Sequence, residues 1–212
     1  MYFKKTSACH NIVLNAMFHE VNALNDEIGG CDKHSRLEAL QALAMYVIVL
    51  ACDPKRCNLL SVMTRVAMGE IARKLVDENG DFSTNERMGK FPTWDEWRFA
   101  ESSRRTLLLI HLMDQVLDFN IGSPNITACR QFDTLPLTCS KEMWEATTCA
   151  SWEIEYTQYL ASRKGNDMLR YGDLRKSSHL DAKDLNNDMV SDIATWASNV
   201  DSLGSMLLNI CH

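Results

Sequence analysis

A helical stretch in the middle of the chain carries the residue types best suited to binding. Trp94, Trp97, Glu101 and Arg105 follow one another at steps of three or four residues, which places them on one helical face. Glu101 precedes Arg105 by four residues, the favourable order for an ion pair within a helix. Two interpretations stay open. The pair is a satisfied, half-buried salt bridge, or it anchors a ligand or partner at a pocket mouth, because Trp and Arg often dominate binding energy.

The cysteines and histidines indicate weaker sites. Cys31 and His34, together with Cys52 and Cys57, could supply four zinc ligands. Their spacing is not the Cys-x2-Cys repeat of a strong zinc site, so we expect neither zinc nor any other cofactor. His111 lies one helical turn from a carboxylate, and we expect a satisfied or partly exposed histidine rather than a catalytic base.

A magnesium site is a further alternative. Asp114 and Asp118 stand four residues apart, so one helical face could present both carboxylates to a cation. The segment 187–191 looks like the start of the second metal motif of class I terpene cyclases. Thr195 stands where that motif ends in an acid, and the paired aspartates of the first motif are absent. A magnesium-dependent enzyme is therefore the rival hypothesis.

Local signals define the helix that carries these residues. Pro92 disfavours helical backbone in the residue before it, and Thr93 with Glu96 forms a capping-box pattern. The apolar face continues to Phe119, so the helix is predicted over residues 93–119. The second half of the chain adds Trp144 and Trp152 at helical spacing. We expect these two rings to join Trp94 and Trp97 in one cluster, with a cost of about 3–5 kcal/mol for Trp144→Ala.

The whole pattern predicts an all-α fold, a single helical domain over residues 1–212 with about six main helices. Two long irregular connections are expected, over residues 80–92 and 120–136, and segment 163–180 is expected to be a solvated connector. The other helices are predicted over residues 7–28, 37–51, 58–78, 140–162 and 189–210.

Three faces of these helices can be assigned. The helix over 37–51 is apolar on most sides and should be central and buried, and Val62 and Val66 should face inward in the next one. The last helix has a seam that suits packing inside the domain or across a homodimer. The seam consists of Met189, Ile193, Trp196, Val200, Leu203, Leu207 and Ile210.

Composition and charge restrict the function. The 212 residues hold 28 acids against 22 bases, a net charge of −6, which argues against direct binding of DNA phosphates. No apolar run is long enough for a bilayer, and the first residues lack a signal peptide. We therefore expect a protein of the nucleus or cytoplasm, with eight cysteines that are reduced thiols.

One ordered set of motifs resembles a known family. Trp94 to Trp97, then Glu101-Ser102 and Arg104-Arg105-Thr106, are similar to the middle homology region of fungal zinc-cluster transcription factors. The resemblance covers about residues 37–152. Its other landmarks are Leu40-Gln41-Ala42, Tyr46, Leu135-Pro136, Trp144-Glu145-Ala146 and Trp152-Glu153.

The resemblance implies a regulatory domain without chemistry of its own. The six-cysteine zinc module that contacts DNA in that family is missing, so the chain is a fragment or a regulatory domain alone. A metabolite or a protein partner would then change the helix packing. Trp94, Trp97, Glu101, Arg105, Trp144 and Trp152 are the candidate binding residues. The rival is a small-molecule enzyme of secondary metabolism with a pocket between helices.

Overall fold

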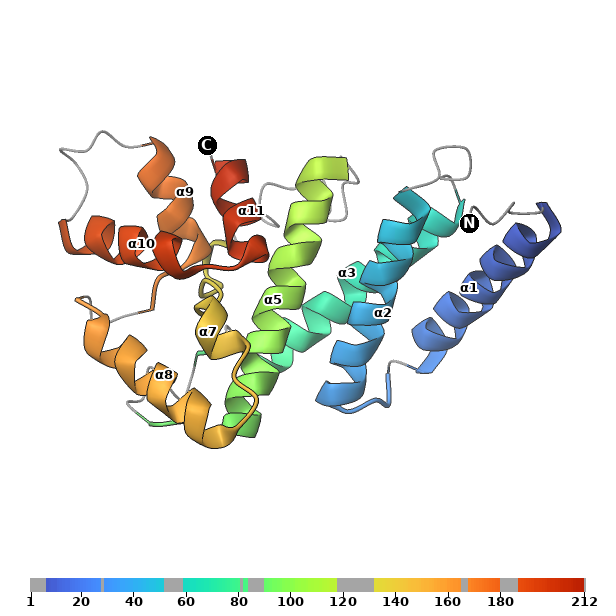
Figure 1. Ribbon diagram of the computed structural model, residues 1–212. Coiled ribbons are helices and arrows are strands. Elements are labelled where there is room, and N and C mark those ends of the chain that lie inside the picture. Colours follow the sequence, from blue (N-terminus) through green and yellow to red (C-terminus); the bar gives the residue numbers. More distant parts are fainter. Residues whose placement is uncertain are drawn as a thin grey trace, which may run out of the picture. The chain divides into compact units, whose positions relative to one another are not determined.

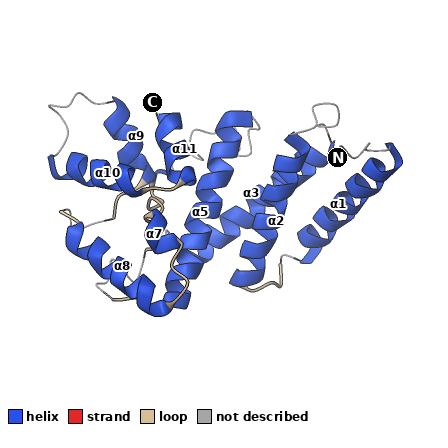
Figure 2. Ribbon diagram, viewed as in Figure 1, coloured by secondary structure: helices blue, strands red, loops and turns tan. Residues whose placement is uncertain are grey.

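Every regular element that the structure describes is a helix (Figures 1 and 2). The computed structural model describes residues 7–27, 29–51, 59–80, 82–83, 90–117, 132–164, 168–179 and 187–211. Over these ranges there are nine helices and no strand, with one isolated bridge between Pro136 and Arg170. The all-α prediction is confirmed, although there are more helices than the six predicted. None of the described helices is long and apolar enough to cross a membrane.

The chain forms two compact units, Met1–Glu78 and Asn79–His212. In the first unit, α1 packs against α2, and an ion pair between Arg36 and Glu78 joins α2 to α3. The carboxylate of Asp32 accepts the backbone N–H of Ser35 at 2.8 Å and so caps the start of α2. The bounds are α1 (Ser7–Glu27), α2 (Lys33–Ala51) and α3 (Leu59–Asn79).

Two helices of the first unit, α1 and α3, end near glycine. α1 ends at Glu27, close to the end predicted at residue 28, and the N–H of Gly30 bonds back to the carbonyl of Glu27. α3 is followed by Gly80, whose φ of 64° lies in the left-handed region that favours glycine.

Two of the predicted faces in this unit are wrong. Val62 and Val66 are exposed, and the buried stripe of α3 runs instead through Thr64, Ala67, Met68, Ile71 and Leu75. The helix over 37–51 is not buried on most sides, since Met45, Ile48 and Val49 are exposed. Only one face of α2 is covered, so the apolar residues on its other faces are exposed, and the prediction of a helix buried on most sides is wrong.

The second unit is built around the long helix α5 (Figure 1). α11 packs against α5, α9 and α10, while α8 packs against α7 and α5. The bounds are α5 (Trp94–Leu117), α7 (Lys141–Trp144), α8 (Cys149–Ser162), α9 (Tyr171–His179), α10 (Asn187–Asn199) and α11 (Ser202–Cys211).

Three predictions for this unit need correction. The helix predicted over 140–162 is broken, because Ser140 caps only the four residues of α7 and Thr148 opens α8 with a capping box to Ser151. Segment 163–180 is not only a connector, because it contains α9. Most of the two predicted irregular connections lies outside the described residues.

The helix predicted over 189–210 is also divided. α10 ends at Asn199, and Asp201 accepts the N–H groups of Leu203 and Gly204 to start α11. The chain passes so close here that a Cβ on Gly204 would lie 2.5 Å from the Cβ of Val200. The seam residues are therefore divided between α10 and α11, with Val200 between the two helices, and α11 packs within the unit. A homodimer through these residues stays a prediction.

Candidate functional site

The start of α5 sets the position of the candidate residues. The backbone N–H of Thr93 donates to the Glu96 carboxylate at 2.9 Å, and the N–H of Glu96 donates to the Thr93 hydroxyl at 3.3 Å. This reciprocal pair is the predicted capping box. It fixes the rotation of α5 about its axis, and Glu101 lies two turns further along.

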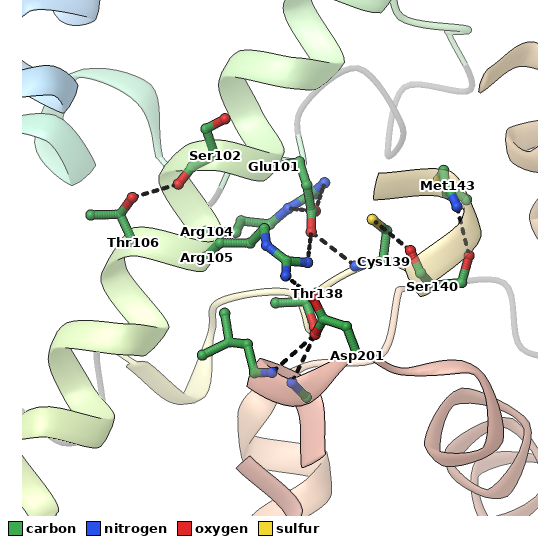
Figure 3. A network of polar contacts seen from close by, with 12 residues as sticks. Glu101, Ser102, Arg104, Arg105, Thr106, Thr138, Cys139, Ser140, Met143 and Asp201 are labelled. Atoms are coloured by element: carbon green, nitrogen blue, oxygen red, sulfur yellow. Dashed lines mark hydrogen bonds and ion pairs between the residues drawn. The ribbon is translucent and has the colours of Figure 1, made fainter. Parts of the chain in front are cut away.

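Glu101 is the centre of a buried ion network (Figure 3). Its carboxylate accepts from Arg104, with a closest contact of 2.9 Å, and from the backbone N–H of Cys139 at 3.0 Å. Arg105 lies 3.5 Å from the other side of the same carboxylate. The side chains of Glu101 and Arg104 are 0% and 1% exposed. The predicted ion pair exists, but its main cation is Arg104, one residue before the predicted partner.

Arg105 reaches away from α5 to α11. Its guanidinium pairs with Asp201 and lies over the ring of Trp144, 4.3 Å from the centroid. Asp201 is at the same time the cap of α11. Arg105 thus connects α5 to the start of α11 inside the protein (Figure 3). A side chain held by these contacts is less suited to bind an external ligand or partner.

Three of the four predicted tryptophans meet. Trp97 and Trp152 are buried with ring centroids 5.5 Å apart, Tyr156 stacks on Trp152 at 5.2 Å, and Trp94 packs against the cluster. Trp144 does not join, because it is 37% exposed and contacts Arg105 instead. The prediction of one four-tryptophan cluster is wrong at this position, since the break after α7 moves Trp144 off the helical stripe of Trp152.

A cavity of about 470 Å³ lies next to this cluster. Its volume falls in the usual range of small-molecule sites, about 300–1,000 Å³. The helices contribute side chains at helical spacing, and α8 and α10 supply most of them. The lining residues are Trp97, Arg104, Leu137, Cys139, Ser140, Glu142, Met143, Glu155, Tyr156, Gln158, Tyr159, Ser162, Arg163, Met168, Leu169, Asp192, Thr195, Trp196 and Asn199.

Two contacts hold α10 at this wall. The indole N–H of Trp196 donates to the carbonyl of Thr138 at 2.7 Å, and the carboxylate of Asp192 accepts the backbone N–H of Lys164 at 3.1 Å. These bonds fix one aromatic ring and one carboxylate in the lining.

The thiol in the lining is not an activated nucleophile. Burial, followed by the nearby Glu101 carboxylate, raises the pKa of Cys139 well above its usual value of 9.0. The thiolate is the reactive form, so this residue stays a neutral thiol.

His111 is the satisfied histidine that its sequence context predicted. It is buried, its Nε2 lies 3.1 Å from the Tyr171 hydroxyl, and its ring stacks on Phe132 at 4.6 Å. Burial, opposed by the charges of Asp114 and Asp133, lowers the pKa of His111 below 6.5. It is absent from the cavity lining.

The alternative metal sites find no geometric support in the described part of the chain. Within the ranges given above, no group of three or more His, Cys, Asp or Glu side chains could hold a metal ion. Cys52, Cys57 and Asp118 lie outside those ranges.

Sequence reasoning found part of this site. Of the six predicted binding residues, only Trp97 lines the cavity. The missed residues include Tyr156, Tyr159, Asp192 and Trp196. Two signals could have found them, because Trp152, Tyr156 and Tyr159 form an aromatic stripe at helical spacing, and Asp192 and Trp196 are one turn apart.

Comparisons of the chain with protein-family models, with curated proteins and with solved structures find no match.

Proposed function

We propose that the chain is an effector-responsive regulatory domain of the kind found in fungal zinc-cluster transcription factors, with its effector site in the cavity of the second unit. The ordered motifs around Trp94 and Arg105 support the family. The lining combines aromatic and apolar side chains with polar ones, and its buried thiol is not activated, which supports binding rather than chemistry.

One observation carries the proposal, namely that the cavity wall and the α11 cap belong to the same network. Arg104 and Cys139 line the cavity and both contact Glu101. Arg105, next to Arg104 in the chain, holds Asp201 at the start of α11. A ligand that displaces the wall would therefore alter the contact between α5 and α11, which is how a binding site changes helix packing.

A reporter experiment tests the effector role. The full chain is fused to a bacterial DNA-binding domain whose operator precedes a reporter gene in a fungal host. Thr195→Phe places a ring in the cavity lining and should change reporter expression several-fold. Ala194→Phe adds the same ring at an exposed position of α10 outside the lining and should change nothing. Equal reporter expression in both variants and the unmodified fusion contradicts the proposal.

A binding experiment tests the expected lack of DNA contact. Phosphate contacts draw their energy from Lys and Arg, and this chain has a net charge of −6. Fluorescence anisotropy with labelled duplex DNA should show no submicromolar, salt-sensitive binding by the isolated chain. Such binding would assign the protein a direct role on DNA and contradict the proposal.

A further inference from the structure

The cavity lining contains more acidic residues than basic ones. It contains the acidic residues Glu142, Glu155 and Asp192 and the basic residues Arg104 and Arg163. The charge of Arg104 is balanced by Glu101 at 2.9 Å, and this pair is fully buried. Apart from the Glu101–Arg104 pair, the lining therefore contains three acidic residues and one basic residue, Arg163.

That guanidinium is held at an aromatic ring. Arg163 is the C-cap of α8, and its charged group lies 5.5 Å from the ring centroid of Tyr159. The contact shows that an aromatic face of this wall already accepts a cation, and cation–π attraction is strongest where water is partly excluded.

The backbone adds negative potential at the same place. The last turn of α8 lines the cavity through Gln158, Tyr159 and Ser162. The C-terminal end of a helix carries a partial negative charge because its last carbonyl groups lack partners within the helix. Carboxylates, aromatic faces and a helix C-terminus all favour a positive ligand.

From these groups we infer that the cavity binds an organic cation, a protonated or quaternary amine with an apolar body. The ammonium group lies near Glu155 and Asp192, and the apolar body packs against Trp97, Tyr156 and Met143. The inference rests on the proposed function, since it names the class of effector for the same cavity.

Three probes of one shape test the charge preference. Phenylbutylammonium, phenylbutanol and phenylbutanoate differ only in the polar group, and calorimetry at low ionic strength, about 0.05 M, measures their dissociation constants. We expect the cation to bind about tenfold more tightly than the alcohol, and the anion to bind most weakly. An alcohol or anion that binds as tightly as the cation overturns the inference, as does the absence of detectable binding by all three probes.

Charge variants locate the site. Glu155→Gln combined with Asp192→Asn should weaken the cation about tenfold and leave the alcohol unchanged, and Arg163→Gln should tighten the cation about threefold. Glu153→Gln is the matched control, because Glu153 lies on α8 outside the lining. A cation affinity that is unchanged in the double variant overturns the inference.

The two proposals fail separately. If Thr195→Phe changes reporter expression but the three probes bind equally, the result supports the effector cavity and contradicts a cationic ligand. If the cation binds selectively and Thr195→Phe abolishes this binding without changing reporter expression, the result supports the cation site and contradicts the regulatory function.

Discussion

One ion pair from each unit of the protein shows how burial changes the role of charged side chains. In the first unit, Arg36 pairs with Glu78, whose side chain is 49% exposed. In the second unit, Glu101 and Arg104 pair in the interior with side chains 0% and 1% exposed. Water solvates Glu78 and so weakens its pair with the buried Arg36, whereas a fully buried pair that loses one member leaves the other charge without its counterion. We therefore expect the second unit to depend more strongly on its buried ion pair than the first unit depends on the Arg36–Glu78 pair.

A spectroscopic difference separates the units experimentally. All five tryptophans lie between positions 94 and 196, in the second unit. Tryptophan fluorescence therefore follows unfolding of the second unit alone, while far-ultraviolet circular dichroism follows helices of both units. The same variant can be scored against both signals.

The largest effect is expected at the buried network. Glu101→Ala removes the carboxylate that neutralises the buried Arg104, and it should lower the free energy of unfolding of the second unit by about 3–5 kcal/mol. Glu78→Ala removes the half-exposed acid of the first unit and should cost less than Glu101→Ala, because water reaches this pair from the Glu78 side. Urea unfolding followed by both signals measures the two values.

A double variant serves as the control for this prediction. Glu101→Leu with Arg104→Leu removes both charges and should be more stable than Glu101→Ala, because no ion remains buried alone. Equal costs for Glu101→Ala and Glu78→Ala would show that the two units do not differ in this respect.

Two tryptophans should differ next. Trp152 is 1% exposed in the aromatic cluster, and Trp152→Ala should cost about 3–5 kcal/mol. Trp144 is 37% exposed and contacts Arg105, so Trp144→Ala should cost about 1 kcal/mol, the value of a cation–π contact at such a site. Thermal unfolding of both variants, followed by the remaining tryptophans, ranks them. A larger loss for Trp144→Ala would contradict the cluster.

The first unit offers a matched pair on α2. Leu40 is fully buried, and Leu40→Ala should cost about 2–4 kcal/mol as a cavity forms. Val49 is 52% exposed, so Val49→Ala should change stability by less than about 0.5 kcal/mol. Circular dichroism melting curves provide the comparison, and a cost at Val49 equal to that at Leu40 would indicate a covered face.

The smallest effect concerns pH. Burial lowers the pKa of His111, so below pH 6.5 the unfolded chain binds a proton that the folded second unit resists, and stability falls as pH decreases. In the first unit, the Ser35 N–H lowers the pKa of Asp32, so the contribution of this carboxylate is lost only as pH falls below 3.8.

As pH decreases, the stability measured by tryptophan fluorescence should therefore begin to fall first, below about pH 6.5. His111→Gln should reduce this slope, and Asp32→Asn should leave it unchanged. A slope that survives His111→Gln would assign it to another group.

The sequence predicted local features well and faces less well. The capping box at Thr93 and the helix predicted over residues 58–78 depend on interactions within a few residues of the chain, and the structure contains both. The predicted buried faces of α2 and α3 were wrong, since Val49 and Val62 are exposed. Several faces of these helices are apolar, so periodicity alone cannot say which one a neighbouring helix covers.

The candidate site shows the same limit. Glu101 and Trp97 were visible from their helical spacing, but Asp201 lies 96 residues after Arg105 in the chain. No local pattern links residues so distant, and the division of the last predicted helix, which brings Asp201 to Arg105, depends on the Asp201 cap and on Gly204.

The bridge made by Asp201 also bears on how the protein folds. One carboxylate oxygen caps the start of α11 and the other pairs with Arg105. The same side chain therefore makes a local helix cap and a contact between residues 96 positions apart. Closing so long a loop is slow compared with forming a helical turn, because more chain entropy is lost. We therefore expect this bridge to form after the folding transition state. Removing Asp201 should then accelerate unfolding and leave the refolding rate nearly unchanged, which stopped-flow fluorescence can measure.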